Sequence, residues 1–277
     1  MNPYRVSVVI PAYNEESAII PCLDAVFAQS PAPDEVVVVD NNSTDHTLDR
    51  LLAYPRPVIV LQESAQGVQH ARNRGFGVAT GDVIVRIDAD TRIPPGYLAA
   101  VHETFADPAV HAATGPVSYY DVPLPRLVAR VDAGLRGLWA RRLDWIFGAN
   151  MAIRRPVWQA ITAELCTDEQ THEDLDLGIH LHDRGYLIVY VRAMLAGTSS
   201  RRIRGTFAGF RHYLMMNERG YRRHVGFRKG GSFARAWVTC RVLLAFYLPM
   251  RCLHEIHRRR HEPVFTAARK NPMSSAR

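Results

Sequence analysis

Residues 81–90 read Gly-Asp-Val-Ile-Val-Arg-Ile-Asp-Ala-Asp, and this stretch decides the fold. Its apolar, largely β-branched run at 83–87 predicts a buried strand, which the Pro-Pro-Gly sequence at 94–96 keeps from continuing. Asp88 and Asp90 stand at the carboxyl end of that strand, where buried carboxylates are costly without a nearby positive charge. Because hard oxygen ligands suit Mg²⁺ and Mn²⁺, the stretch predicts a divalent cation site or, alternatively, an acidic turn that caps the next helix.

The segments around this stretch predict an α/β fold. Strand-like runs alternate with helical patterns, the strands at 6–10, 35–39 and 58–62 and the helices at 17–29, 47–53 and 67–79. This rhythm predicts a Rossmann-like, mostly parallel central sheet flanked by helices. Polar clusters at Asn14, Asp40 and Asp88 follow three strands, and ligands of parallel sheets bind beyond the carboxyl strand ends. We therefore expect one shared binding site, although the glycine-rich dinucleotide loop and the P-loop lysine motif are both absent from the sequence.

The second half of the chain continues with shorter elements. We expect helices at 98–105, 124–145, 158–161 and 173–184, strands at 110–117 and 187–191, and a small-residue turn at 147–150. The helix that begins at residue 173 carries Glu173, Asp174 and Asp176 in its first turn. Negative charge is favourable there, but capping explains only one of the three acids.

Composition limits the classes of protein and partner. The chain has 277 residues and a net charge of +7, and its arginines concentrate from Arg201 onward. This excess predicts an anionic partner, such as phospholipid headgroups, a polyphosphate ligand or nucleic acid, or else a solvated basic face. The four cysteines have no paired spacing and the first strand follows directly on the N-terminal residues, so we expect reduced thiols, no signal peptide and a cytoplasmic location.

The C-terminal region contains the most apolar segment, at 236–250. It is shorter than the ~20 residues that span a bilayer, and Arg241 interrupts it. It predicts either a helix lying in the membrane interface or a helix packed on the core. The histidines at 254, 257 and 261 stand among arginines, which favours a solvated basic tail over a structural zinc site.

Six motifs occur together in a fixed order along the sequence, at 7–15, 37–45, 71–73, 88–90, 148–150 and 173–174. Together they resemble family 2 glycosyltransferases with the GT-A fold, over roughly residues 5–195. The resemblance implies an inverting transfer of a sugar from a nucleotide diphosphate-sugar, a UDP- or GDP-sugar, to an acceptor hydroxyl, with Mg²⁺ or Mn²⁺ as cofactor.

The resemblance also implies the roles of individual residues. The loop with Pro11, Ala12, Tyr13 and Glu15 and the acid Asp40 would hold the base and ribose, with Arg72 near the nucleotide. Asp88, followed by Ala89, would face the ribose and Asp90 would bind the metal. Asp174 would be the general base that takes the acceptor proton. We place Asn150, Glu173, Arg201 and Arg202 on the acceptor or diphosphate side.

The chemistry of the residues agrees with these roles but does not select every one of them. A leaving diphosphate needs a cation, and an inverting displacement needs one base on the opposite face. Crowding by Glu173 and Asp176 is expected to raise the pKa of Asp174. Spacing alone leaves the choice between Glu173 and Asp174 open, and the resemblance points to Asp174.

Two departures from the family pattern matter. Many relatives have a further metal-contacting histidine after the last strand, but no histidine occurs here between His182 and His212. The metal is therefore expected to depend mainly on Asp90. The Q-x-x-R-W signature of processive members is also missing, which favours a single transfer.

We divide the chain into a GT-A domain at 1–200, with a nucleotide-binding half (1–95) and an acceptor half (96–200), and a basic helical extension at 201–277. That extension suggests a protein peripheral to the cytoplasmic membrane face with a lipid-linked acceptor, and no nucleic-acid partner is expected. Two rival functions are a nucleotidyltransferase, whose glycine-rich loop is missing at 11–15, and a catalytically inactive basic α/β protein that binds membranes or nucleic acid.

Overall fold

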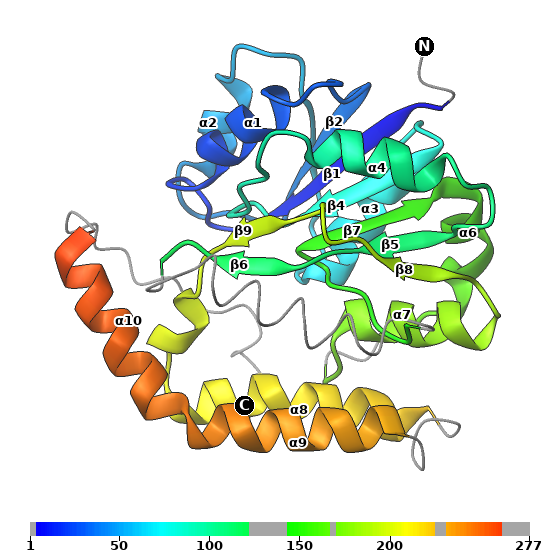
Figure 1. Cartoon of the computed structure of the whole chain (residues 1–277). Helices are drawn as coiled ribbons and strands as arrows, with labels where there is room; N and C mark the ends of the chain where they lie inside the picture. The colour runs from blue at the N-terminus through cyan, green and yellow to red at the C-terminus, as the bar shows by residue number, and fades with distance from the viewer. Residues whose placement is uncertain (1–3, 122–142, 167–169, 225–230, 262–277) are drawn as a thin grey trace.

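A seven-stranded sheet forms the centre of the computed structural model, which describes residues 4–121, 143–166, 170–224 and 231–261. The strand order is β3-β2-β1-β4-β7-β5-β8 (Figure 1). The strands are β1 (Val6–Ala12), β2 (Glu35–Asp40), β3 (Ile59–Gln62), β4 (Val83–Ile87), β5 (Ala112–Thr114), β7 (Asn150–Arg154) and β8 (Ile188–Tyr190). The four strands predicted in the first half of the sequence are confirmed.

The sheet is parallel except at β7, which runs antiparallel to both β4 and β5. The mostly parallel α/β prediction is therefore confirmed. The sequence did not indicate that the apolar run at 151–154 inserts beside β4 in the opposite direction. This insertion brings the turn before β7 to the carboxyl end of β4, because antiparallel neighbours exchange ends.

Alternating side chains of the strands build two apolar layers. Val8 and Ile10 lie in one layer, and Val9 lies in the other. The first layer is covered by α1 (Ile19–Phe27), α2 (Thr47–Leu52) and α4 (Tyr97–Phe105), and the second by α3 (Val68–Val78), α6 (Arg155–Ile161) and α7 (Glu173–Asp183) (Figure 1). Burial on both faces explains the nearly continuous valine and isoleucine runs of β1, β2 and β4.

The strand expected at 110–117 is wrong as a single element, because the chain divides there into β5 and β6 (Val117–Tyr119). A Cβ atom on Gly115, between them, would come within 2.0 Å of the Met194 carbonyl oxygen, so the backbone passes closely at this point. Strand β6 pairs with β9 (Ala196–Thr198), which the sequence did not reveal, in a separate two-stranded sheet.

The helix expected at 124–145 lies mostly outside the described residues, and its described end, residues 143–145, is not helical. Residue 144 carries a bend, and the chain then enters the turn before β7. The helix predicted from the apolar periodicity of that segment therefore does not extend over residues 143–145.

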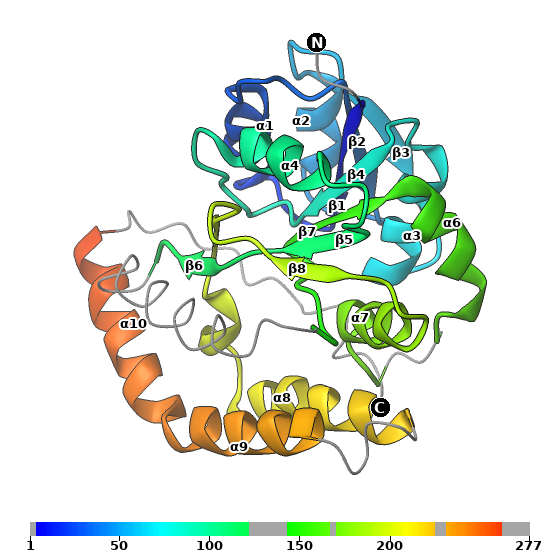
Figure 2. The same ribbon diagram turned by 45° about the vertical axis from the view of Figure 1, so that its right-hand side comes forward.

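The C-terminal region forms three helices, α8 (Phe207–Arg223), α9 (Gly231–Ala245) and α10 (Tyr247–His261). Helices α8 and α9 lie side by side along one edge of the α/β body, and α10 turns away from them (Figures 1 and 2). Cys240 and Tyr247 are buried against Phe210 and Leu214, whereas Val242 and Phe246 are about half exposed. The apolar segment at 236–250 thus packs on α8 with one face and leaves the other face open.

One expectation for the histidines of α10 is wrong. His254 is buried, and its Nδ1 atom lies 2.9 Å from Ser200 Oγ, so it joins α10 to the end of the α/β body. It is a packing residue because the helix turns this face inward, and not part of a solvated tail. The side chains of residues 257–261 are outside the described part of the chain.

Across the described helices, none is by itself both long enough and apolar enough for a bilayer crossing. Residues Gly231–Ala245 and Tyr247–Ile256 reach that standard only when counted together, and the two segments meet at a bend of 55°.

Candidate functional site

Neighbouring strands β2, β1 and β4 bring their carboxyl ends to one edge of the sheet, where the predicted polar clusters meet. Pro11 and Ala12 are buried at the end of β1, and Tyr13 follows, half-buried. The loops after β1 and β2 hold each other in place. Asn14 donates its backbone N–H to Ser43 Oγ at 3.0 Å, and its side-chain Oδ1 accepts the Thr44 N–H at 2.8 Å.

Asp40 closes β2 and is buried at this edge. Its Oδ2 atom accepts a long hydrogen bond of 3.4 Å from the Ser43 N–H, whereas Oδ1 has no partner among the described residues. A buried carboxylate oxygen without a donor is costly, by about 1–3 kcal/mol or more. The Oδ1 atom is therefore suited to accept a hydrogen bond from a ligand N–H or O–H group.

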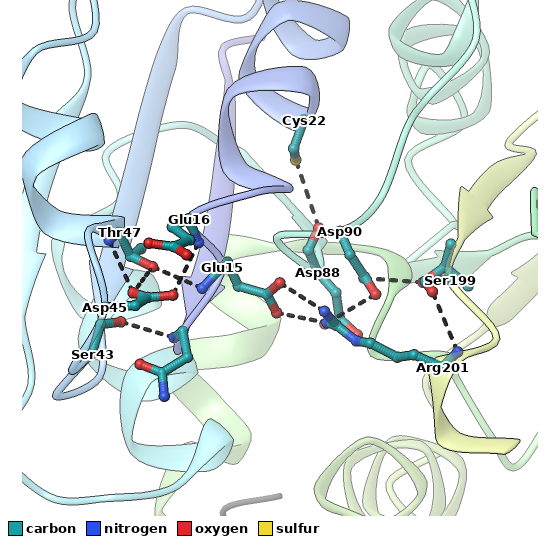
Figure 3. Close-up of polar contacts among 12 residues, drawn as sticks. Glu15, Glu16, Cys22, Ser43, Asp45, Thr47, Asp88, Asp90, Ser199 and Arg201 are labelled. Atoms are coloured by element: carbon teal, nitrogen blue, oxygen red, sulfur yellow. Dashed lines mark hydrogen bonds and ion pairs between the residues drawn. The ribbon is translucent and has the colours of Figure 1, made fainter. Parts of the chain in front are cut away.

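Arg201 bridges two acids of the site, Glu15 and Asp90 (Figure 3). Its guanidinium donates to both Glu15 carboxylate oxygens at 2.9 and 2.6 Å, and its Nη2 lies 2.9 Å from Asp90 Oδ2. Burial, opposed by Arg201 and reinforced by Glu15 and Asp88, raises the pKa of Asp90 to about 6. The positive charge that the sequence required beside Asp90 is thus supplied by the protein itself.

The donor set fits a divalent cation. Asp88 and Asp90 follow β4, Glu15 follows β1, and all three offer the hard oxygen donors that Mg²⁺ and Mn²⁺ prefer. The segment after β9 also reaches this place, since Thr198 Oγ1 donates to Asp90 Oδ1 at 3.1 Å. It contributes the Thr198 hydroxyl and the Arg201 guanidinium to this place.

Arg86 is a functional candidate that sequence reasoning missed. It lies fully inside β4, donates to Glu173 Oε1 at 2.7 Å and contacts Asp88 Oδ1 at 3.2 Å. Its signal in the sequence was a charge within an apolar strand, two residues before Asp88 and therefore on the same face. It connects the sheet edge to the start of α7.

Glu173 also receives Arg72 of α3, whose Nη1 donates to Glu173 Oε2 at 2.8 Å. Burial opposes ionisation of Glu173, but Arg86 and Arg72 outweigh it and lower its pKa. Arg72, predicted near the nucleotide, forms an ion pair with Glu173. Glu173 is likewise occupied by two arginines.

Asp174 differs from its neighbour because it has no ion pair among the described residues. Its Oδ2 accepts the Gly148 N–H and its Oδ1 the Leu175 N–H, both at 2.8 Å. Burial first, and Glu173 second, raise its pKa. A Cβ on Gly148 would come within 2.7 Å of the Arg86 guanidinium, so this glycine lets the turn approach both Arg86 and Asp174.

The remaining predicted residues have other places. Asp176 turns away from Asp174 and pairs with His224 at 3.0 Å, so it takes no part in crowding the base. Asn150 is fully buried, receives Tyr97 OH at 2.7 Å, and donates to the carbonyls of Pro116 and Met194. Asn150 therefore connects α4 with the segments around Pro116 and Met194, and its side chain is not exposed in this structure. Ala89 is buried between the two aspartates, and the Arg202 side chain is outside the described part.

Two family models match the chain. The model described as glycosyl transferase family 2 matches residues 7–152, and that described as glycosyl transferase family group 2 matches residues 83–255. The expected resemblance is therefore confirmed over the segment that builds the sheet edge and α3.

Curated relatives cover parts of the chain. An undecaprenyl-phosphate 4-deoxy-4-formamido-L-arabinose transferase from Pectobacterium carotovorum is 30% identical over 207 residues, which are 72% of this chain and 57% of that protein. Hyaluronan synthase from Streptococcus pyogenes is 33% identical over 122 residues, 40% of this chain and 29% of the synthase. The chain thus spans less than two thirds of the length of either relative.

Among solved structures, a mannosyltransferase from Pyrobaculum calidifontis in complex with GDP-Man and Mn²⁺ superposes with a TM-score of 0.68. The match covers 94% of this chain and 76% of that one at 23% sequence identity. This likeness supports the GT-A fold.

The double pairing of Glu173 leads to a stability prediction. Glu173→Gln leaves Arg72 and Arg86 buried without their shared carboxylate, so we expect it to lower the free energy of unfolding by about 3–5 kcal/mol in urea titrations. The control Glu164→Gln removes an exposed partner of Arg184 and is expected to cost less than about 1 kcal/mol.

The pH dependence of the free energy of unfolding is measured with the same two variants. Because the pKa of Glu173 is lowered in the folded protein, its contribution is complete above the ordinary glutamate pKa of about 4.3 and is lost as the pH falls below it. Equal costs for the two variants at neutral pH would show that the arginines find other partners.

Proposed function

Because the chain belongs to glycosyl transferase family 2, we propose that it moves one sugar from a UDP- or GDP-sugar to an acceptor hydroxyl with inversion. The division of labour among its acids carries this proposal. Glu173 is held by two arginines, whereas Asp174 next to it has only backbone donors and stays available for a proton. The missing Q-x-x-R-W signature supports a single transfer.

In this proposal the loops after β1 and β2 receive the nucleotide. Asp40 Oδ1, which is buried and without a donor, would accept a hydrogen bond from the base or ribose. Tyr13, half-buried at the end of β1, borders the same edge of the sheet. The mannosyltransferase with the same fold binds GDP-Man, which supports a nucleotide-sugar as the donor.

Asp90 would hold the Mg²⁺ or Mn²⁺, with Asp88 beside it, and the bound cation would neutralise charge on the departing diphosphate. Arg201 already lies between Glu15 and Asp90, so its guanidinium is at hand for a diphosphate oxygen. The buried Arg86 would hold the Asp88 carboxylate in its orientation.

Asp174 would take the proton from the acceptor hydroxyl. The Gly148 and Leu175 N–H groups orient its carboxylate. The Gly148 backbone in turn packs closely against the Arg86 guanidinium. The base is therefore oriented by the same buried arginine that contacts Asp88. Glu173 would act through that arginine as a positioning residue.

Thermal unfolding with nucleotides tests the donor proposal. UDP or GDP should raise the melting temperature with Mn²⁺ and much less without it, since a ligand at 100 times its Kd adds about 2.7 kcal/mol. Asp40→Asn replaces the unpartnered acceptor by an N–H₂ donor of the same shape and should reduce this rise. The control Asp24→Asn, on the exposed side of α1, should not. Absence of any Mn²⁺-dependent rise with either nucleotide contradicts the proposal.

Hydrolysis of a panel of UDP- and GDP-sugars tests the base, and it is measured by the release of nucleoside diphosphate. Asp174→Asn should abolish turnover, because it removes the proton acceptor. The nucleotide affinity, obtained from the thermal shift, should change by no more than a few fold. The control Asp183→Asn alters an exposed acid at the other end of α7 and should keep turnover. Turnover surviving in Asp174→Asn would place the base elsewhere, with Glu173 next to be changed.

We also propose that the basic extension from residue 201 meets an anionic membrane surface and brings a lipid-linked acceptor to the site. Large apolar side chains of α9, α10 and the residue between them are 44–68% exposed, namely Trp237, Val238, Val242, Phe246, Leu248, Leu253 and Ile256. Arg235, Arg241 and Arg251 flank them. Exposed aromatic and aliphatic groups beside arginines suit the interface of an anionic bilayer.

Vesicle sedimentation tests this surface. The chain should bind phosphatidylglycerol vesicles, more weakly at high salt, and bind phosphatidylcholine vesicles poorly. Changing Trp237, Phe246 and Leu248 to Ser together should abolish binding without disturbing Cys240 and Tyr247, which pack on α8. The control triple change of Leu52, Ile59 and Leu187 to Ser, also exposed, should retain binding. Equal binding by both triple variants would contradict the proposal.

A further inference from the structure

Four side chains with metal-binding atoms converge behind the first turn of α7, away from the nucleotide edge. They are Cys166, Asp176, His180 and His224, and their ligand atoms all lie within 4.8 Å of one another. Asp176 and His180 are one helical turn apart on α7, and His224 follows the last turn of α8. Cys166 stands in the segment after the short 3₁₀-helix Thr162–Glu164.

The atoms centre on one carboxylate oxygen. Asp176 Oδ1 lies 3.0 Å from His224 Nε2 and 3.6 Å from His180 Nε2, and Cys166 Sγ lies 4.0 Å from His180 Nε2. Ligand atoms around a tetrahedral zinc, with bonds of 2.0–2.3 Å, are separated by roughly 3.3–3.7 Å. The observed separations bracket that range, so small side-chain rotations are enough to accommodate an ion.

The surroundings already orient these groups. Asp176 Oδ2 accepts the Cys166 N–H at 2.9 Å, which leaves Oδ1 facing the two imidazoles. The His180 and His224 rings meet edge to face with centroids 4.8 Å apart. The side chains of Asp176, His224 and His180 are only 3%, 11% and 18% exposed. Ligating carboxylates in metal sites are commonly held in orientation by a further hydrogen bond, as the Cys166 N–H holds Asp176 here.

Charge and protonation are compatible with an ion. Burial opposes ionisation of Asp176, but hydrogen bonds from His224 and Cys166 outweigh it and lower its pKa. Burial and Asp176 raise the pKa of Cys166, and a hydrogen bond with Arg223 acts in the opposite direction. Metal binding would release the thiol proton. Cys166 forms no disulfide and is free to ligate.

We propose that Cys166, Asp176, His180 and His224 form a closed, structural Zn²⁺ site that fastens α7, the helix with the proposed base Asp174, to the C-terminal extension. One sulfur, two imidazole nitrogens and one carboxylate favour Zn²⁺ over the hard cations suited to Asp90. Four protein ligands leave no open position for a substrate. The site joins the segment before α7, α7 itself and the end of α8, and Asp174 lies two residues before the ligand Asp176.

The experiment uses the full chain with any affinity tag removed. Elemental analysis after dialysis should find about one equivalent of zinc, and removal with a chelator should lower the melting temperature until zinc is added back. Co²⁺ in its place should give the visible absorption of a tetrahedral site and a thiolate charge-transfer band. A wild-type chain that retains no zinc, shows no such Co²⁺ spectrum and gains no stability from zinc overturns the proposal, whatever the behaviour of variants.

Variants locate the ion. Cys166→Ser should remove the charge-transfer band and His224→Ala should remove most of the zinc. Cys252→Ser, at an exposed cysteine, and His212→Ala, within α8, should retain both. Asp90→Asn should keep the zinc while losing the Mn²⁺-dependent nucleotide shift, which separates this site from the proposed donor site. Zinc retained by Cys166→Ser and His224→Ala together would place it elsewhere and overturn the assignment.

Discussion

The ion-pair chain Asp88–Arg86–Glu173–Arg72 is the interaction on which the site depends. Arg86 is a full positive charge inside a strand that is otherwise apolar, and such a charge is tolerated only when acids surround it. Asp88 supplies one acid directly after the same strand, and Glu173 supplies the other from α7. The sheet edge and the helix N-terminus are thereby held at a fixed distance, although they are far apart in sequence.

The same constraint separates the roles of adjacent acids. Glu173 has both oxygens in ion pairs, Asp174 has both on backbone N–H groups, and Asp176 faces two histidines. Three carboxylates in one helical turn thus have three different environments. Helix geometry explains this, because side chains at successive positions point about 100° apart around the axis.

The sequence predicted what is local. Strands of consecutive buried valines, the breaks at Pro94 and Gly96, and the polar residues after each strand follow from side-chain chemistry and period. What it did not predict depends on contacts between distant segments. β7 inserts antiparallel between β4 and β5, and the strand expected at 110–117 is interrupted at Gly115, where the Met194 backbone passes closely. Arg201 reaches Glu15 across 186 residues, and His224 meets Asp176 across 48. The six ordered motifs indicated the family, but they did not include Arg86, a single charged residue in an apolar strand.

The ion pairs of Arg201 have a consequence for the binding and release of the proposed nucleotide-sugar. A pocket lined with bare carboxylates would repel an incoming diphosphate and would be expensive to leave empty. Here the Arg201 guanidinium acts as an internal counter-ion that is shared by Glu15 and Asp90 and offsets part of their charge. Loading such a pocket exchanges one set of ion pairs for another, so the charge buried in the protein changes little. The same exchange in reverse favours departure of the product, since the acids regain their own partner as it leaves.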